Sequence, residues 1–424
     1  MNMEQIIELP QEWPGIHYIG EEEINAVIQV LKAQSPFRYY GPKPRYEARE
    51  FEKEFAQFIG MEYCVAVSNG TTALQVALSA LGVGPGDEVI MPGYFWVSTA
   101  GAVARLGAIP VLTDVDDSMS IDPADLEKKI SKRTKAVIVV HMGGVIGQIK
   151  KIVDICKSQD IPILEDCAQA AGASQYGKMA GSFGNMSIFS FQINKNMTCG
   201  EGGAVLTNDK RLYERAFGIH DTGYIKDSEG NFVLDRPELQ LWGIGCRLSD
   251  LAAAMARVQL KKLPEIVRRM RSFKHELIDI IAKYEGVRHR TIADPAGDSG
   301  GFLKMTFKDR DSAYRFKELL LKSGIKVANS GFYPIHMEEW GLHIYYNLPS
   351  LVNKRPSMGS RSVWELTENS FARDYSYEKG SLLYLDSLIE RTVIFCVASN
   401  LNDQHKDVIR KAFVTTCDQL LQKR

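Results

Sequence analysis

Between residues 62 and 207 the chain alternates short apolar runs with stretches of helical periodicity, and this alternation constrains the fold more than any other feature. The predicted strands are 63–67, 88–91, 109–113, 136–140, 161–165, 187–191 and 204–207. Several of them, such as AVIVV at 136–140, are apolar on successive residues, which is typical of strands buried on both faces of a parallel sheet. The sequence therefore predicts an α/β domain with a mostly parallel seven-stranded sheet covered by helices.

The rest of the chain is organised around this domain. Helices are predicted at 72–81, 123–130, 149–158 and from 248 to about 284. Residues 221–246 are polar, turn-rich and longer than an ordinary connection, so we expect them either to cover a site or to be mobile. We predict three parts: an N-terminal arm and helix (1–35), a large domain (36–265) and a smaller α+β C-terminal domain (266–424).

Length and composition indicate a globular protein of more than one domain: 424 residues, 45% hydrophobic and 24% charged. Lys and Arg (51) nearly balance Asp and Glu (52), which leaves no electrostatic footprint for nucleic acid or an anionic membrane. There is no apolar run long enough to span a membrane, and the acidic N-terminus does not resemble a signal peptide. Seven scattered cysteines without a C-x-x-C pair favour neither a disulfide framework nor a zinc site. We therefore expect a cytoplasmic enzyme with no nucleic-acid, membrane or metal partner.

Residues 68–74, with the sequence SNGTTAL, lie where a predicted strand ends and a predicted helix begins. The unpaired N–H groups of a helix N-terminus attract anions, and the hydroxyl side chains of such a segment add further donors. The alternative interpretation is a simple N-cap, in which the hydroxyl or amide side chains serve the backbone only. This segment alone is compatible with both.

Two further residues could carry chemistry. Asp166, in LEDCAQA, lies at the carboxyl end of a predicted buried strand, where open α/β sheets place their ligands. A protonated ring nitrogen of a ligand could partner this acid, although Asp166 could instead cap the next helix. Lys195 follows another apolar strand and precedes a glycine-rich turn. A solvated surface lysine is the common case, whereas a partly desolvated amine can form a Schiff base with a carbonyl.

Together, an anion cradle, an acid for a ring nitrogen and a Schiff-base lysine are what pyridoxal phosphate requires. The motifs SNGTTAL, GDEVIMPGYFWVSTAGAV, LEDCAQAAGA and KNMTCGEGGAV, in this order, resemble those of the DegT/DnrJ/EryC/StrS family of sugar aminotransferases. The resemblance extends over nearly the whole chain. It implies the aspartate aminotransferase fold, known as fold type I of pyridoxal-phosphate enzymes.

The resemblance also implies roles for individual residues. Lys195 is expected to form the Schiff base with the cofactor and later to move a proton. Asp166 is expected to keep the pyridine nitrogen protonated, and Gln169 to hydrogen-bond the ring hydroxyl.

Four further residues are expected to contact the cofactor. Thr71 and Thr72 would offer backbone N–H groups to the phosphate, and Ser190 a hydroxyl. Trp96 would stack on the ring, although an aromatic residue packed in the core is the competing interpretation.

One position departs from the family pattern. Members usually carry G-x-N-x-R, whose asparagine reaches the cofactor phosphate of the neighbouring subunit, whereas residues 243–247 here read GIGCR. Gly245 takes the place of the asparagine and has no side chain to donate. The homodimer that builds each family site from two chains is still expected.

The implied reaction moves an amino group from glutamate or glutamine to a keto sugar. The acceptor is expected to be a nucleotide-linked keto-deoxy sugar or a related amino-sugar precursor. The alternatives are an 8-oxo-octulosonate, since residues 294–303 resemble the octulosonate enzymes of the family, and a keto-cyclitol. A sugar dehydratase of the same family would carry histidine in place of the lysine, and a non-catalytic scaffold would not need the lysine and the acid. Substrate contacts are expected at Arg38, Tyr39, Tyr40, Arg247 and His336, with a structural ion pair as the alternative for Arg247.

Overall fold

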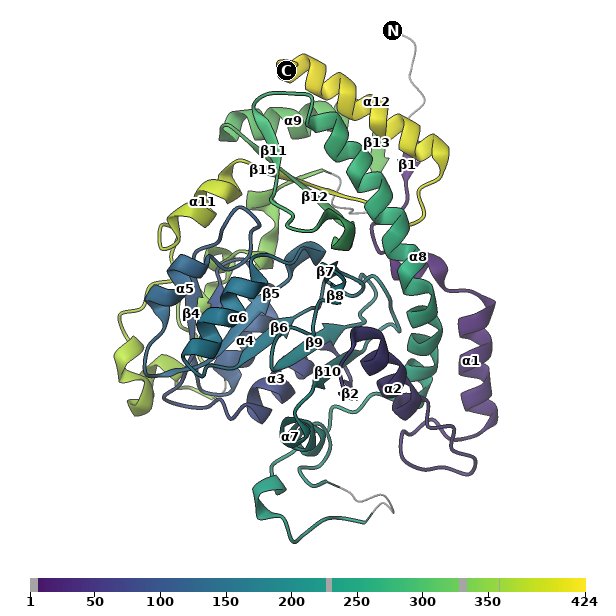
Figure 1. Cartoon of the computed structure of the whole chain (residues 1–424), viewed down its shortest axis with the longest axis vertical. Helices are drawn as coiled ribbons and strands as arrows, with labels where there is room; N and C mark the ends of the chain where they lie inside the picture. The colour runs from purple at the N-terminus through teal and green to yellow at the C-terminus, as the bar shows by residue number, and fades with distance from the viewer. Residues whose placement is uncertain (1–6, 226–230, 328–333, 358) are drawn as a thin grey trace.

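The computed structural model describes residues 7–225, 231–327, 334–357 and 359–424. A large α/β body and a smaller sheet lie at opposite ends of the molecule, and the long helix α8 (Asp250–Ile281) runs beside both (Figure 1).

The large body is built on a seven-stranded sheet with the order β2-β10-β9-β6-β5-β3-β4. Its strands are β2 (Tyr63–Val67), β3 (Glu88–Pro92), β4 (Ile109–Thr113), β5 (Thr134–Val140), β6 (Ile163–Asp166), β9 (Met186–Ser190) and β10 (Gly203–Thr207). Only β10 runs antiparallel to its two neighbours, β2 and β9; the other pairs are parallel. The seven predicted strands and the mostly parallel sheet are thus confirmed. Almost every side chain of these strands is buried, as expected for a sheet covered on both faces.

The six helices that accompany this sheet in the described part of the chain are α2 (Glu47–Ile59), α3 (Gly70–Ala80), α4 (Val97–Arg105), α5 (Pro123–Lys129), α6 (Ile149–Ser158) and α7 (Lys210–His220). Three of them (α3, α5 and α6) match helices predicted from the sequence. Helix α3 packs on β9 and β10 and contacts α4 and α7, whereas α5 contacts α6. The short hairpin of β7 (Ser174–Gln175) and β8 (Lys178–Met179) follows the end of β6.

The smaller body has an antiparallel sheet of order β11-β12-β15-β14, which confirms the α+β character of the C-terminal region. Its elements are β11 (Val287–His289), β12 (Phe302–Phe307), α9 (Arg310–Lys322), β14 (Ile335–His336), α11 (Leu383–Glu390), β15 (Thr392–Cys396) and α12 (Asp403–Leu420). The N-terminal arm joins this end of the molecule, since β1 (Ile7–Leu9) pairs in parallel with β13 (Ile325–Val327). Helix α1 (Glu21–Lys32) packs along α8. The predicted boundary after residue 265 falls inside α8.

Residues 341–382, called here the outer segment, leave the small body and pack along the edge of the large sheet. They form 3₁₀ turns and the short helix α10 (Pro349–Val352). Asn369 accepts a hydrogen bond from Gly86 N–H and donates one to the carbonyl of Gly107, and the Tyr377 hydroxyl donates to the carbonyl of Pro110. Although the outer segment lies within residues 266–424, its anchors are therefore on the large body.

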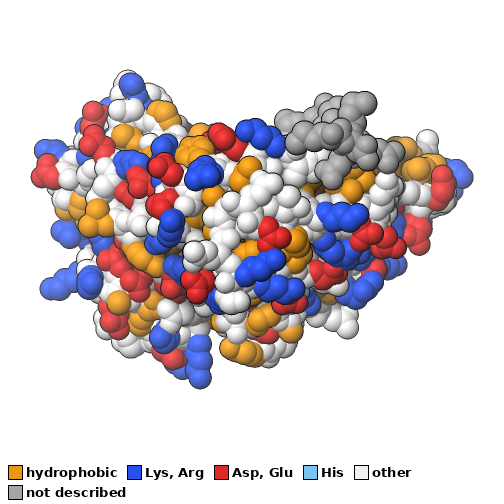
Figure 2. Space-filling model, turned by 90° about the horizontal axis from the view of Figure 1, so that it is seen from above, with side chains coloured by type: hydrophobic (Ala, Val, Ile, Leu, Met, Phe, Trp, Pro, Cys, Tyr) orange, Lys and Arg blue, Asp and Glu red, His pale blue; other side chains and the backbone are white. Residues whose placement is uncertain are grey.

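The surface carries charges of both signs. On the face seen in Figure 2, acidic and basic side chains are interspersed rather than gathered by sign. Among the described helices, none combines the length and the apolar character that crossing a membrane requires.

Candidate active site

A cavity of about 480 Å³ opens at the carboxyl ends of β2, β5, β6 and β9. This is the edge at which open α/β sheets bind their ligands. The residues predicted to hold a cofactor come together around it: Thr71, Thr72, Trp96, Asp166, Gln169, Ser190 and Lys195. They come from the ends of four strands, β2, β3, β6 and β9, and the turns that follow them, so the fold, and not the local sequence, assembles them.

The N-terminus of α3 forms one end of the cavity. The helix itself offers no acceptor to the N–H groups of Gly70 and Thr71. A Cβ atom at Gly70 would lie 2.8 Å from Cβ and 3.2 Å from Oγ of Ser190, so only glycine leaves the space between this helix end and Ser190 open. The result is a small cradle bounded by two N–H groups and a hydroxyl, which suits an anion.

Thr72 departs from its predicted role. Its N–H donates to Asn69 Oδ1 (2.8 Å), and its hydroxyl donates to the Asn69 carbonyl (2.9 Å). Asn69 therefore caps α3, and the N–H of Thr72 is already used within the chain. The two alternatives drawn from SNGTTAL hold for different residues: Thr72 belongs to the N-cap, whereas Gly70 and Thr71 form the cradle. The Thr71 hydroxyl donates to Ser98 Oγ (2.8 Å).

Asp166 ends β6 and lies deep in the cavity. Its carboxylate accepts hydrogen bonds from the Thr99 hydroxyl (2.9 Å) and from Ala168 N–H (3.1 Å). Burial raises the pKa of Asp166 above its ordinary value, and the two hydrogen bonds and the positive charge of Lys195 oppose this shift. Such an acid is stabilised as a carboxylate by a further cationic partner in the cavity.

Lys195 follows β9 and also lines the cavity. Burial of its amine lowers its pKa to about 8, and the negative charges of Asp166 and Glu201 only partly offset this effect. The turn that carries it is fixed by the backbone, because Lys195 N–H donates to Gln192 O (3.0 Å) and Gly15 N–H donates to Lys195 O (3.0 Å). Near neutral pH a larger fraction of this amine is therefore neutral, and hence nucleophilic, than of an ordinary lysine.

Trp96, Gln169 and His343 also line the cavity and lie next to one another. Trp96 is 43% exposed, so it is not packed in the core. Its indole lies 4.8 Å from the His343 ring, and Gln169 Nε2 lies 3.4 Å from His343 Nε2. His343 comes from the outer segment.

Behind the cavity, Glu165 organises the backbone. Its two oxygens accept hydrogen bonds from the N–H groups of Gly181, Phe183 and Gly184 and from the ring of His141, at 2.6–2.9 Å. His141, Glu165 and Cys167 lie close enough to one another for a metal ion. The hydrogen bonds already occupy the four lone-pair positions of Glu165, which makes this a structural cluster.

The residues proposed for substrate contact do not line the cavity in this chain. Arg38 is buried in an ion pair in which its Nη2 donates to both oxygens of Glu52 (2.8 and 3.0 Å), and its Nη1 donates to the Ala66 carbonyl, so its role is structural. Tyr39 packs beside it, with its hydroxyl 3.4 Å from His220 Nε2. Tyr40 is 69% exposed.

Two more of these residues have structural partners. Arg247 forms an ion pair with Asp221, which is the alternative that the sequence left open. His336 is buried in β14, where its ring stacks on Tyr314 at 3.9 Å and its Nδ1 accepts from Glu338 N–H. The histidine of this region that lines the cavity is His343 instead.

Gly245, the departure from the family pattern, has a backbone φ of +65°. This left-handed conformation is open to glycine and, among other residues, most readily to asparagine. A Cβ atom at Gly245 would meet nothing within 4 Å. The exchange of asparagine for glycine therefore preserves the backbone and removes only the side chain.

Comparison with known proteins agrees with this geometry. The model of the DegT/DnrJ/EryC1/StrS aminotransferase family matches residues 17–350. The chain belongs to this family. Two curated relatives and one solved structure illustrate the similarity.

The L-glutamine:scyllo-inosose aminotransferase of Streptomyces griseus is 37% identical over 274 residues, 62% of this chain and 64% of that protein. The GDP-perosamine synthase of Escherichia coli O157:H7 is 38% identical over 236 residues, 55% of this chain and 62% of that protein. The chain thus aligns with less than two thirds of the length of either relative. The aminotransferase TlmJ from Streptoalloteichus hindustanus superimposes with a TM-score of 0.74 at 26% identity, covering 99% of this chain and 100% of that one, which confirms the predicted fold.

Several residues that line the cavity were not predicted as site residues. Gln192, Asn194 and Glu201 flank Lys195 in sequence, and their proximity to it is the signal that could have found them. His343 lies 148 positions after Lys195 and outside any recognised motif, and no local pattern distinguishes it from His336.

Proposed function

We propose that this protein is a pyridoxal-phosphate-dependent aminotransferase that moves an amino group from glutamine or glutamate to a keto sugar or keto-cyclitol. The observation that carries the proposal is the placement of Lys195 and Asp166 in one cavity, together with the cradle at Gly70, Thr71 and Ser190. Family membership supports it.

The cavity fits the cofactor on three independent features. The cradle suits a phosphate, because two N–H groups of a helix N-terminus and a hydroxyl converge where a Cβ atom would otherwise lie. Asp166 is a buried acid whose raised pKa reflects the need for a cationic partner, which a protonated ring nitrogen supplies. Trp96 lines the cavity and is not packed in the core, so its indole can stack on a ring.

When bound, pyridoxal phosphate supplies an aldehyde and an electron-withdrawing ring. Asp166 would hold the proton on the ring nitrogen, while Thr99 and Ala168 keep the carboxylate in place. Gln169 would donate to the ring hydroxyl. Lys195 would attack the aldehyde through its neutral amine. Once an amino donor has displaced it, the same amine would move a proton from the carbon that bears the donor's amino group to the former aldehyde carbon.

The acceptor is proposed from the relatives and from the sequence. The names of two relatives specify a keto-cyclitol with glutamine as donor and a nucleotide-linked amino sugar, respectively. An 8-oxo-octulosonate is kept as the third candidate, because residues 294–303 resemble the octulosonate enzymes of the family. A sugar dehydratase is disfavoured, since Lys195 occupies the position where those enzymes carry histidine.

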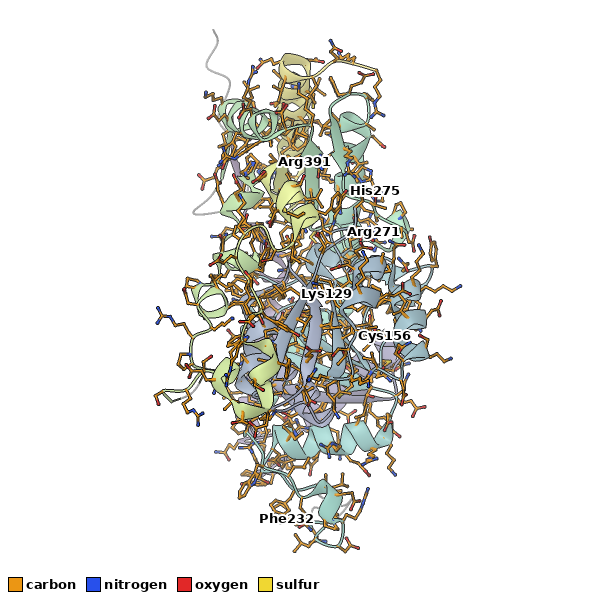
Figure 3. The ribbon with its side chains drawn as sticks, turned by 90° about the vertical axis from the view of Figure 1, so that its left-hand side faces the viewer. Lys129, Cys156, Phe232, Arg271, His275 and Arg391 are labelled. Carbon is orange, nitrogen blue, oxygen red and sulfur yellow. The ribbon has the colours of Figure 1, made fainter. Side chains whose placement is uncertain are left out.

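We also propose a homodimer. Residues 231–245 project beyond α7 at the end of the molecule opposite the small body (Figure 1). Figure 3 shows Phe232 at this far end, away from Arg271 and Arg391. The projection exposes large apolar side chains, with Trp242 94% and Leu234 66% exposed. Exposed apolar residues gathered in this way are typical of a protein interface, and sedimentation velocity of wild type and Trp242→Ser tests it.

The central test traps the cofactor on the protein. The purified protein is loaded with pyridoxal phosphate, reduced with borohydride and digested, and we expect the cofactor mass on the peptide that contains Lys195. The Lys195→Ala variant should lose both the label and the visible absorbance, whereas Lys178→Ala, which removes an exposed lysine on β8, should keep both. Label on other lysines only, or full turnover by Lys195→Ala, would overturn the proposal.

The same loaded protein identifies the substrate. Amino donors convert the visible absorbance of the bound cofactor in a half-reaction without any acceptor. Glutamine, glutamate, GDP-perosamine and the amino derivative of scyllo-inosose are added separately. The compounds that convert the absorbance define the donor and the product class.

A further inference from the structure

A chain of three hydrogen bonds runs through Gln169 and His343, two residues that line the cavity. Gly143 N–H donates to Gln169 Oε1 (3.0 Å), Gln169 Nε2 lies 3.4 Å from His343 Nε2, and His343 Nδ1 lies 2.9 Å from the Trp340 carbonyl oxygen. The two end groups belong to the backbone, whereas Gln169 and His343 contribute the side chains between them.

The backbone groups set the direction of the whole chain. Gly143 N–H can only donate, so the end of the Gln169 amide that faces it is the oxygen. The Trp340 carbonyl can only accept, so Nδ1 of His343 carries a proton. In the neutral ring, Nε2 is then the acceptor for one N–H of Gln169, which leaves the second N–H of that amide for a group in the cavity.

The surroundings of His343 keep its ring neutral and fixed. The ring lies between two indoles, 4.8 Å from that of Trp96 and 4.7 Å from that of Trp340. Burial lowers the pKa of His343 to about 3, and the nearby positive charges of Lys195 and Lys304 act in the same direction. Protonation of the ring would turn Nε2 into a donor and break the contact with Gln169.

The small body holds the other end of the chain. The peptide of Gly143 has a φ of +65° and belongs to the turn that follows β5. Arg290, which is buried, donates to the carbonyls of Met142 (2.7 Å) and Gly143 (3.0 Å). Both ends of the hydrogen-bonded chain are therefore held by residues that follow α8 in sequence, while Gln169 belongs to the large body.

We propose that His343 is a positioning residue that fixes the Gln169 amide with its free N–H directed at the ring oxygen of the cofactor. This inference rests on the proposed function. Its consequence is that the outer segment, through one imidazole, sets how strongly Gln169 binds the cofactor ring. Without the acceptor at Nε2, the Gln169 amide can rotate, and the ring oxygen loses a donor and becomes more basic.

The test is a double-mutant cycle of His343→Leu and Gln169→Leu on the loaded protein. His343→Leu should weaken cofactor affinity about tenfold, the effect of one hydrogen bond. It should also raise the pH midpoint of the bound cofactor's visible absorbance by about one unit. His343→Gln, which restores an acceptor, should recover most of both effects. In the Gln169→Leu background, His343→Leu should cause little further change in cofactor affinity or in the pH midpoint.

A control separates positioning from general loosening of the outer segment. Tyr345 anchors that segment through hydrogen bonds from its hydroxyl to both oxygens of Asp386 (3.1 Å). Tyr345→Phe should therefore reduce stability but leave the pH midpoint of the absorbance unchanged. Equal midpoint shifts in Tyr345→Phe and His343→Leu, or additive losses in the cycle, would overturn the inference.

The tautomer is tested without any cofactor. In protein labelled with ¹⁵N-histidine, the His343 ring should stay neutral, with the proton on Nδ1, between pH 5.5 and 8. A proton on Nε2 or a cationic ring would refute the proposed role of His343. If Lys195 takes up no cofactor, the proposed function fails, yet this measurement still decides the geometry of His343.

Discussion

The two walls of the cavity are built in different ways. One wall consists of strand ends of the large sheet, where Asp166, Ser190 and Lys195 follow directly after β6 and β9. The other consists of Trp96, Gln169 and His343. Of these, His343 belongs to the outer segment, which packs on the large body.

Each wall depends on one buried polar residue that ties backbone groups together. Glu165 binds three N–H groups and His141 beneath the large-sheet wall. Asn369 binds Gly86, Gly107 and Val363 beneath the outer segment. The first holds together residues 16–24 positions apart, whereas the second joins segments more than 260 positions apart. We therefore expect the large-sheet wall to unfold with the whole molecule, whereas the outer segment that carries His343 should open on its own.

The largest effect is expected at Glu165. Glu165→Ala leaves three buried N–H groups without an acceptor and should lower the free energy of unfolding by about 3 to 5 kcal/mol. Urea denaturation followed by fluorescence measures it. Glu165→Gln, which keeps one acceptor oxygen, should lose less. A loss below about 1 kcal/mol in Glu165→Ala would show that this wall does not depend on the carboxylate.

Asn369→Ala should destabilise the outer segment more than the molecule as a whole. Three hydrogen bonds of 2.7–2.8 Å are lost, which corresponds to about 2 to 3 kcal/mol. Hydrogen exchange should accelerate within residues 341–382 while β5 and β6 stay protected. Asn353→Ala, in the same segment but exposed and bonded only locally, is the control. Equal acceleration in both regions would mean that the two walls form one cooperative unit.

These contrasts also explain what can be predicted from the sequence. Strand ends are recognisable because a buried strand is apolar on successive residues, so Asp166 and Lys195 can be placed at a common edge from the residue pattern alone. His343 cannot, because its position depends on how the outer segment folds back onto Gly86 and Gly107, and no local pattern encodes that contact. His336, which is predicted as a substrate contact, is buried and does not line the cavity, and no local pattern distinguishes it from His343.

The walls should also differ in how they respond to pH. Lys195, with a pKa of about 8, titrates near neutrality, whereas His343, with a pKa of about 3, stays neutral there. Only the neutral amine attacks an aldehyde, so cofactor association should accelerate about tenfold per pH unit below 8 and level off above it. Stopped-flow absorbance from pH 6 to 10 measures this. A midpoint near the ordinary lysine value would contradict the burial of this amine.

The smallest expected difference comes from a matched pair of hydroxyl deletions. Thr99→Val removes a donor (2.9 Å) from Asp166 in the large-sheet wall, and Tyr375→Phe removes a donor (2.6 Å) from Glu88 under the outer segment. Each carboxylate keeps a second donor, Ala168 N–H for Asp166 and the Ser131 hydroxyl for Glu88, so each variant should lose only about 1 to 2 kcal/mol of stability.

The two variants should nevertheless differ in cofactor binding. Loss of the Thr99 donor raises the pKa of Asp166 further, because the hydrogen bond favours the charged carboxylate, and a less ionised acid holds a protonated ring nitrogen less firmly. Cofactor affinity should therefore fall severalfold in Thr99→Val and stay constant in Tyr375→Phe, as measured by fluorescence titration. An equal fall in both would mean that affinity follows stability alone, and that Asp166 has no separate part in holding the ring.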